Sequence, residues 1–184
     1  ASLFKKGPYK VLTVFLTGEA SAAAINGAAS DEVIFLNFSS REIRGLKIGA
    51  IGALRKIIAS RQTALIIAHR FKPIYIACLA SKLPVIGVHH AFGDYDRPQR
   101  RWFVQFFKKR LALLAVSNAV RDDIRKHFPD WPTEQIETLY NRLDIKAVVS
   151  TNLPRASARE ALGLPQNVPV IGNVGRLHPD KDQE

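Results

Sequence analysis

The sequence predicts an α/β fold: a Rossmann-like, doubly wound sheet whose strands are mostly parallel. Short apolar runs alternate with segments of helical periodicity along the 184 residues, and this alternation is typical of parallel βαβ units. Polar residues follow most of the apolar runs, as they do at the ligand-binding edge of such a sheet. Hydrophobic residues make up 47% of the chain, which is enough to form a core.

Strands are expected in the short apolar runs, many of which contain β-branched residues. These runs lie at residues 9–16, 31–38, 64–68, 85–88, 111–116, 136–139 and 168–174. Between them, helices are expected at residues 46–61, 73–82, 97–110, 119–128 and 157–162, and the Ala-rich residues 20–29 form a short helix or a loop.

Three of these helices have a clear sequence signal. Apolar residues from Ile48 to Ile58 recur every three or four positions, which is helical spacing. Pro73 lies in the first turn of the next helix, where proline is tolerated, and Gly163 stops the last one. Residues 153–166 have the composition of a connector, so the strand at 168–174 is expected to belong to a different domain.

The polar residues that follow the strands predict a ligand-binding cleft. They are Gly18 and Glu19, His69 and Arg70, His89 and His90, Ser117 and Asn118, Asn141 and Asp144, and Arg176. In doubly wound sheets, ligands bind at the carboxyl ends of the strands. Glu19, Arg70, His89 and Asn118 are therefore candidates to line the cleft, although Ser117 and Asn118 are also favoured helix caps.

The chain carries a formal net charge of +11 and has a pI near 10.1. This excess predicts attraction to an anionic partner: a phosphorylated small molecule, an anionic membrane surface or a nucleic acid. Nucleic acid is the least favoured of the three because no recognition motif is visible. No apolar run reaches the roughly 18 residues that span a bilayer, and no signal peptide is visible, so a cytoplasmic location is expected.

Cysteine and histidine usage adds little chemistry. The single cysteine, Cys78, lies in an apolar stretch and is expected to be a small buried side chain in a reducing compartment. The five histidines and this cysteine lack the spacing of a zinc site, so no metal is expected. The chain begins with Ala and contains no Met, which hints at a processed or excised piece.

Two stretches carry a family resemblance. Residues 114–144 contain LAVSNAVRDDIRKHFP followed by IETLYNRLD, and the chain ends in VGRLHPDKDQE. In order and spacing they resemble the centre of the family-4 glycosyltransferases, which are retaining sugar transferases with the two-domain GT-B fold. The resemblance implies that residues 1–155 form the N-terminal, acceptor-side domain. Residues 156–184 would then be the linker and first strand of a nucleotide-sugar domain that is largely missing.

The resemblance also implies roles for particular residues. Arg176 and Lys181 match the cations that contact the donor diphosphate, where fixed positive charge stabilises the leaving group. His90 matches a histidine that approaches the transferred sugar, and a core or supporting role is its alternative. Gly18 matches a loop near the donor phosphates. This loop usually has two adjacent glycines, and Arg142 stands where the family usually has glycine, so the sequence departs from the pattern at both places.

A basic, aromatic helix is predicted at residues 97–110, with six cations among its 14 residues. Its spacing places Phe103, Phe106, Phe107 and Arg110 near one face. Aromatic rings beside cations are suited to a membrane interface. The residues expected to contact the membrane are Arg100, Arg101, Trp102, Phe103, Lys108 and Lys109. The alternative is an ordinary amphipathic helix that packs its phenylalanines on the sheet.

The sequence therefore favours part of a retaining glycosyltransferase. It would move a sugar from a nucleotide-sugar to a membrane-associated glycan or glycolipid, for example the core of a lipopolysaccharide, at the inner face of the cytoplasmic membrane. The nucleotide-sugar is a substrate, no cofactor is expected, and the chain alone is expected to be inactive. The alternative is a non-catalytic basic module that binds an anionic ligand or nucleic acid.

Overall fold

The computed structural model describes residues 8–142 and 145–175. The chain divides into two compact units, and the boundary in the sequence lies between Asn141 and Arg142. The predicted domain boundary between residues 155 and 156 rests on the family resemblance and stays a prediction.

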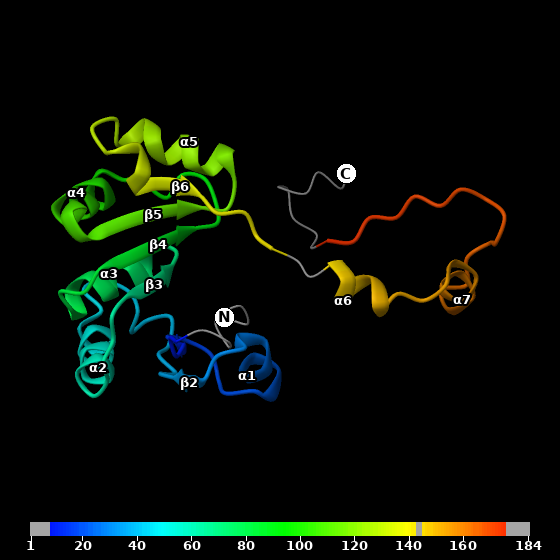
Figure 1. Ribbon diagram of the computed structural model, residues 1–184, viewed down its shortest axis with the longest axis horizontal. Helices are drawn as coiled ribbons and strands as arrows, with labels where there is room; N and C mark the ends of the chain where they lie inside the picture. Colours follow the sequence, from blue (N-terminus) through cyan, green and yellow to red (C-terminus); the bar gives the residue numbers. More distant parts are fainter. Residues whose placement is uncertain (1–7, 143–144, 176–184) are drawn as a thin grey trace. The chain divides into compact units, whose positions relative to one another are not determined.

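The first unit contains alternating strands and helices (Figure 1). They are β1 (Leu12–Phe15), α1 (Ala22–Ala28), β2 (Glu32–Phe35), α2 (Ile48–Ala59), β3 (Ile66–His69), α3 (Phe71–Ala80), β4 (Val85–His89), α4 (Pro98–Phe106), the 3₁₀ turn η2 (Lys108–Arg110), β5 (Leu111–Ala115), α5 (Asn118–His127), the 3₁₀ turn η3 (Thr133–Gln135) and β6 (Ile136–Thr138). Each of the first six predicted strands is present, and residues 20–29 contain a helix.

All the strand pairs are parallel, which confirms the predicted Rossmann-like α/β class. β3, β4, β5 and β6 form one sheet in that order, and β1 pairs with β2 in a second sheet. Helix α3 packs on β3 and β4, α5 packs on β5 and β6, and α2 packs on α3. Because all four strands of the larger sheet are parallel, their carboxyl ends lie along one edge.

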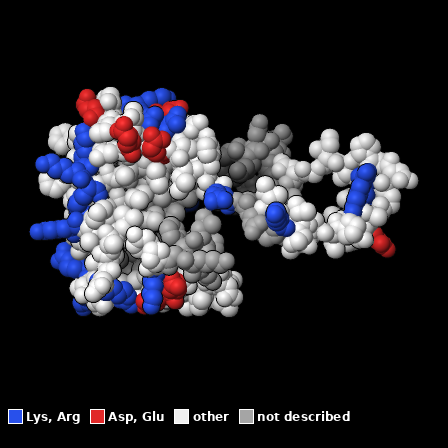
Figure 2. Space-filling model, viewed as in Figure 1, with Lys and Arg blue, Asp and Glu red and all other residues white. Residues whose placement is uncertain are grey.

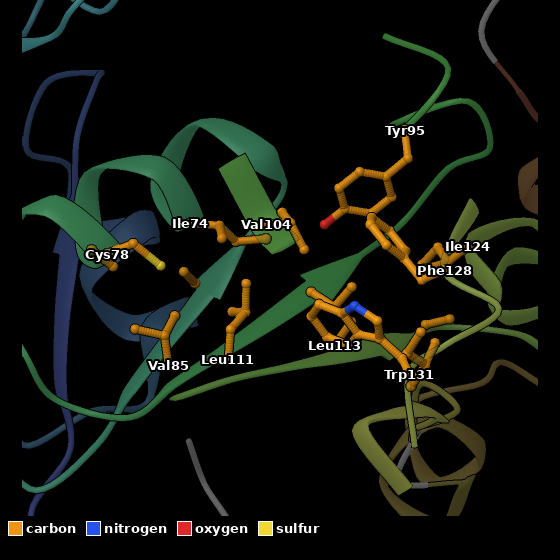
Figure 3. Packing of buried hydrophobic residues seen from close by; sticks show 14 of the residues in the cluster. Ile74, Cys78, Val85, Tyr95, Val104, Leu111, Leu113, Ile124, Phe128 and Trp131 are labelled. Carbon is orange, nitrogen blue, oxygen red and sulfur yellow. The ribbon is translucent and has the colours of Figure 1, made fainter. Parts of the chain in front are cut away.

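The core lies between the larger sheet and its helices (Figure 3). Leu111, Leu113 and Ala115 alternate toward this core along β5, and each is at most 2% exposed. In β4, a Cβ on Gly87 would clash with the side chain of Ile74 in α3. Gly87 therefore lets α3 approach the sheet closely, and a larger residue would force the side chain of Ile74 to move.

The predicted buried cysteine is confirmed. Cys78 in α3 is 2% exposed and has a free thiol, and burial raises its pKa to about 11. Its carbonyl accepts a hydrogen bond from the guanidinium of Arg110, which also donates to the carbonyl of Leu83 at 2.8 Å. Arg110 thereby ties the end of α3 to the start of β5.

The helix predicted at residues 97–110 is shorter than expected. α4 ends at Phe106, and η2 turns the chain into β5 at Leu111. Phe103 and Phe107 pack against the core, as the alternative of an ordinary amphipathic helix expects, but Phe106 is 81% exposed and does not share their face. Val104 is fully buried, so the inward face of α4 runs through Phe103, Val104 and Phe107, and Phe106 lies on the outward side with Trp102.

The second unit contains α6 (Ile145–Ser150) and α7 (Arg155–Ala161), followed by an extended segment. α7 confirms the predicted last helix and is followed by Gly163 at φ +64°. The strand predicted at 168–174 is wrong: these described residues belong to no sheet, and Ile171 is fully exposed. An apolar run becomes a strand only when another strand pairs with its backbone groups.

None of the helices within residues 8–142 and 145–175 is both long and apolar enough to cross a membrane.

Candidate functional site

Two histidines meet at the carboxyl edge of the larger sheet. His69 ends β3 and His90 follows β4, and the parallel pairing of these strands brings the two residues together. Nδ1 of His69 lies 3.0 Å from Nε2 of His90, and the ring centroids are 5.3 Å apart. One ring donates this hydrogen bond and the other accepts it, so the pair is not doubly protonated.

Both rings favour the neutral form. Burial and the nearby charge of His90 lower the pKa of His69. Burial and the charges of Arg70 and His89 lower the pKa of His90, although Asp94 opposes this shift. A neutral imidazole with an exposed edge can accept a hydrogen bond or a proton from a sugar hydroxyl.

His89, predicted to line the cleft, lies in the interior instead. It is fully buried and forms two hydrogen bonds: Nδ1 is 2.7 Å from Oδ2 of Asp94, and Nε2 is 3.0 Å from the hydroxyl of Tyr95. Asp94 also accepts from Arg100, whose Nη1 lies 3.1 Å from Oδ1. These four residues form a network that fixes the loop after β4.

The pKa shifts in this network decide which atom holds each proton. Burial alone would raise the pKa of Asp94, but its hydrogen bond with His89 and the charges of His89 and Arg100 outweigh burial and lower it. Burial raises the pKa of Tyr95 well above its ordinary value. An ionised Asp94 therefore accepts from Nδ1–H of His89, and the Tyr95 hydroxyl, which keeps its proton, pairs with Nε2. Both ring nitrogens of His89 are thereby held, directly before His90.

Arg70 lies beside the histidine pair in a strained conformation. Its φ of 71° and ψ of 165° fall in a region that essentially only glycine adopts. Its amide donates to the carbonyl of Val88 at 2.7 Å, so the turn from β3 into α3 is tied to β4. Strain of this kind costs about 1–3 kcal/mol and occurs preferentially at functional sites.

The other predicted site residues are not joined to the histidine pair. Gly18, at φ +90°, and Glu19 are exposed after β1, and within the described chain no hydrogen bond links them to His69 or His90. Asn118 is exposed and accepts from Arg121 at 3.1 Å. Ser117 caps α5 by accepting from the amide of Val120, which confirms the capping alternative.

Three residues of the predicted cleft and donor site fall outside the part of the chain that the structure describes. Arg176 and Lys181, expected at the donor diphosphate, and Asp144 lie outside the described residues. Between residues 8 and 175, where described, no group of three or more His, Cys, Asp and Glu side chains is arranged to hold a metal ion.

Sequence reasoning missed Asp94 and Tyr95 because they lie in a loop rather than at a strand end. The available signal was short range: Asp94 follows His89 by five residues, and Tyr95 is an apolar ring in an otherwise polar GDYD stretch. A buried histidine needs partners for both ring nitrogens, and this loop supplies them.

Of the predicted membrane-contact residues, some are engaged with other parts of the protein and others are exposed. Phe103 packs inward against Phe71 and Tyr75, and Arg100 is engaged with Asp94. Trp102 is 79% exposed, one helical turn before the exposed Phe106, and a surface pocket of about 320 Å³ lies beside it. Lys109 is exposed, Lys108 donates to the carbonyl of Asp130, and Arg101 donates to the carbonyls of Tyr95 and Asp96.

A family model described as Glycosyltransferase Family 4 matches residues 9–147, which cover every strand from β1 to β6. A search of curated proteins found no match.

Proposed function

Because the chain belongs to glycosyltransferase family 4, we propose that it forms the acceptor-side part of a retaining transferase that uses a nucleotide-sugar donor. The acceptor is a membrane-associated glycan or glycolipid, such as a lipopolysaccharide core. The observation that carries this proposal is the neutral His69–His90 pair at the carboxyl edge of the sheet, where α/β folds bind their ligands.

In this proposal His90 accepts a hydrogen bond from a sugar hydroxyl, and His69 fixes its ring. The 3.0 Å contact orients His90, while the buried network of His89, Asp94 and Tyr95 holds the preceding backbone. Orientation of this kind lowers the entropic cost of reaching the reactive geometry. The donor diphosphate is assigned to Arg176 and Lys181, and Gly18 to the donor loop, by the family pattern alone.

The test is a transfer assay on the protein as it is encoded. A panel of radiolabelled nucleotide-sugars is offered with a glycolipid extract, and the anomeric configuration of the product is read by NMR. We expect transfer with retention, and we expect His90→Ala to lower kcat/KM by about 10²-fold. His127→Ala, in α5, is the matched control and should leave the rate unchanged. An inverted product, or full activity in His90→Ala, would contradict the proposed mechanism.

The α4 surface supports a membrane-associated acceptor. Trp102 and Phe106 are exposed on one face of α4, and Lys109 follows in η2. Figure 2 shows Lys and Arg side chains gathered along the left edge of the first unit, where β4 and β5 begin in Figure 1. Exposed aromatic rings beside cations bind the interface of an anionic bilayer.

Vesicle sedimentation tests this contact. The double variant Trp102→Ser/Phe106→Ser should reduce binding to vesicles that contain anionic lipid by at least tenfold, because two large apolar side chains are removed from the interface. Leu139→Ser/Leu162→Ser, at two exposed leucines elsewhere, is the control. Equal binding by both double variants would remove α4 from the membrane contact.

A further inference from the structure

An aromatic platform lies where α3 and α4 meet. The ring centroids of Tyr75 and Phe103 are 4.7 Å apart, and that of Phe71 lies 6.5 Å from Tyr75 and 5.9 Å from Phe103. Two cations rest on this platform. Nζ of Lys47 is 4.4 Å from the centre of the Tyr75 ring, and the guanidinium carbon of Arg100 is 4.7 Å from that of Phe71. Cation–π contacts of this length hold long, flexible side chains in place.

The positive charge on this platform is poorly balanced. Lys72 is exposed in the first turn of α3, and burial together with the charges of Lys72 and Arg100 lowers the pKa of Lys47. Asp94 pairs with Arg100, but in the described part of the chain no carboxylate pairs with Lys47 or Lys72. Cations gathered without counter-charges repel one another, and an anion placed among them would relieve that repulsion.

These cations also retain free donors. Lys47 donates to the carbonyl of Gly45 at 2.6 Å, which uses one of its three protons. Arg100 uses Nη1 for both of its bonds to Asp94, which leaves Nε and Nη2. The side chain of Arg100 is 25% exposed, so part of it faces solvent.

We propose that Lys47, Lys72 and Arg100 bind an anionic group, a phosphate or a carboxylate, on the acceptor sugar. The inference rests on the proposed transferase function and specifies its acceptor as an anionic glycan. Asp94 joins Arg100 directly to His89, the residue before His90, so this network links Arg100 to the end of the strand that leads into His90. Leu46 and Ile48, which are 68% and 73% exposed, flank Lys47 and offer apolar contact to the ligand's carbon skeleton.

The experiment titrates the full chain with four probes: glucose, glucose 6-phosphate, glucuronate and UDP. Binding is followed by NMR on the ¹⁵N-labelled chain. We expect glucose 6-phosphate or glucuronate to bind at least tenfold more tightly than glucose, and the tighter of the two identifies the anion. The double variant Lys47→Gln/Lys72→Gln should lose that preference, because it removes two cations and leaves Arg100 and its network intact.

The control is Lys56→Gln/Lys82→Gln, which removes the same charge from two exposed lysines elsewhere on the first unit. It should keep the preference. Equal losses in both double variants would overturn the site, because net charge alone would then explain binding. If UDP binding falls in Lys47→Gln/Lys72→Gln as much as sugar-phosphate binding does, the anion belongs to the donor and the assignment to the acceptor is refuted. Since no transfer is measured, failure of the transferase proposal is seen separately in the His90→Ala assay.

Discussion

Removing the hydroxyl of Tyr95 tests the buried network behind the histidine pair. In Tyr95→Phe the ring keeps its contacts with Phe71, His89 and Phe128, whose centroids lie 6.3, 5.1 and 4.9 Å away. Only the hydrogen bond to Nε2 of His89 is lost. Tyr95 is 1% exposed and His89 is fully buried, so water does not replace the missing donor.

The cost follows from this burial. Leaving a buried acceptor without a partner destabilises a protein by about 1–3 kcal/mol. With a urea m-value of about 2 kcal/mol per M for a domain of this size, the unfolding midpoint should fall by roughly 0.5–1.5 M. The m-value itself should not change, because the same surface is exposed on unfolding.

Equilibrium urea unfolding, followed by circular dichroism, measures this shift. Tyr140→Phe is the control, since Tyr140 is 58% exposed and its hydroxyl remains in water; its midpoint should stay within about 0.3 M of the parent's. A shift in Tyr95→Phe no larger than that of the control would refute the contribution of the Tyr95–His89 hydrogen bond to the network.

Two other predictions concern the fold and the histidine pair. Gly87→Ala should lower the free energy of unfolding by about 1–3 kcal/mol, because the new methyl group clashes with Ile74. The control, Gly52→Ala on α2, places its methyl group in open space and should not destabilise the chain. A larger loss of stability in Gly52→Ala than in Gly87→Ala would contradict the packing. The pKa values of His69 and His90 are lowered in the folded chain from the ordinary histidine value of 6.5. As the pH falls through 6.5, the unfolded chain therefore binds protons before the folded chain does. Stability should therefore be complete above about pH 7 and fall as the pH drops below 6.5, and His69→Gln/His90→Gln should flatten this dependence; an unchanged slope would show that the pair does not titrate as inferred.

The parallel strands and the edge that carries the site were predictable because both depend on local patterns. Apolar runs bounded by polar residues fixed the positions of β3 to β6, and the rule for parallel sheets then placed His69 beside His90. The segment at 168–174 has an equally apolar pattern and is not a strand, because pairing depends on a neighbour that local sequence does not reveal. Likewise, the direction of Phe106 depends on which face of α4 packs on the core, and buried Val104 turns that face away from Phe106.

The helix starts show how stability and ligand binding compete at this edge. α1 and α5 begin at Ser21 and Ser117, whose side chains cap the first turn. In contrast α2, α3 and α4 begin at Lys47, Arg70 and Arg97, none of which forms a side-chain cap. A cation near a helix N-terminus opposes the helix dipole, and a missing cap costs about 1 kcal/mol. The uncapped, basic starts belong to the three helices that carry the aromatic platform and its cations. The capped α5 starts beside His89 instead, whose carbonyl accepts from the amide of Val116. This distribution is what we expect if positive charge at the platform serves an anionic ligand at the expense of the stability of the free chain.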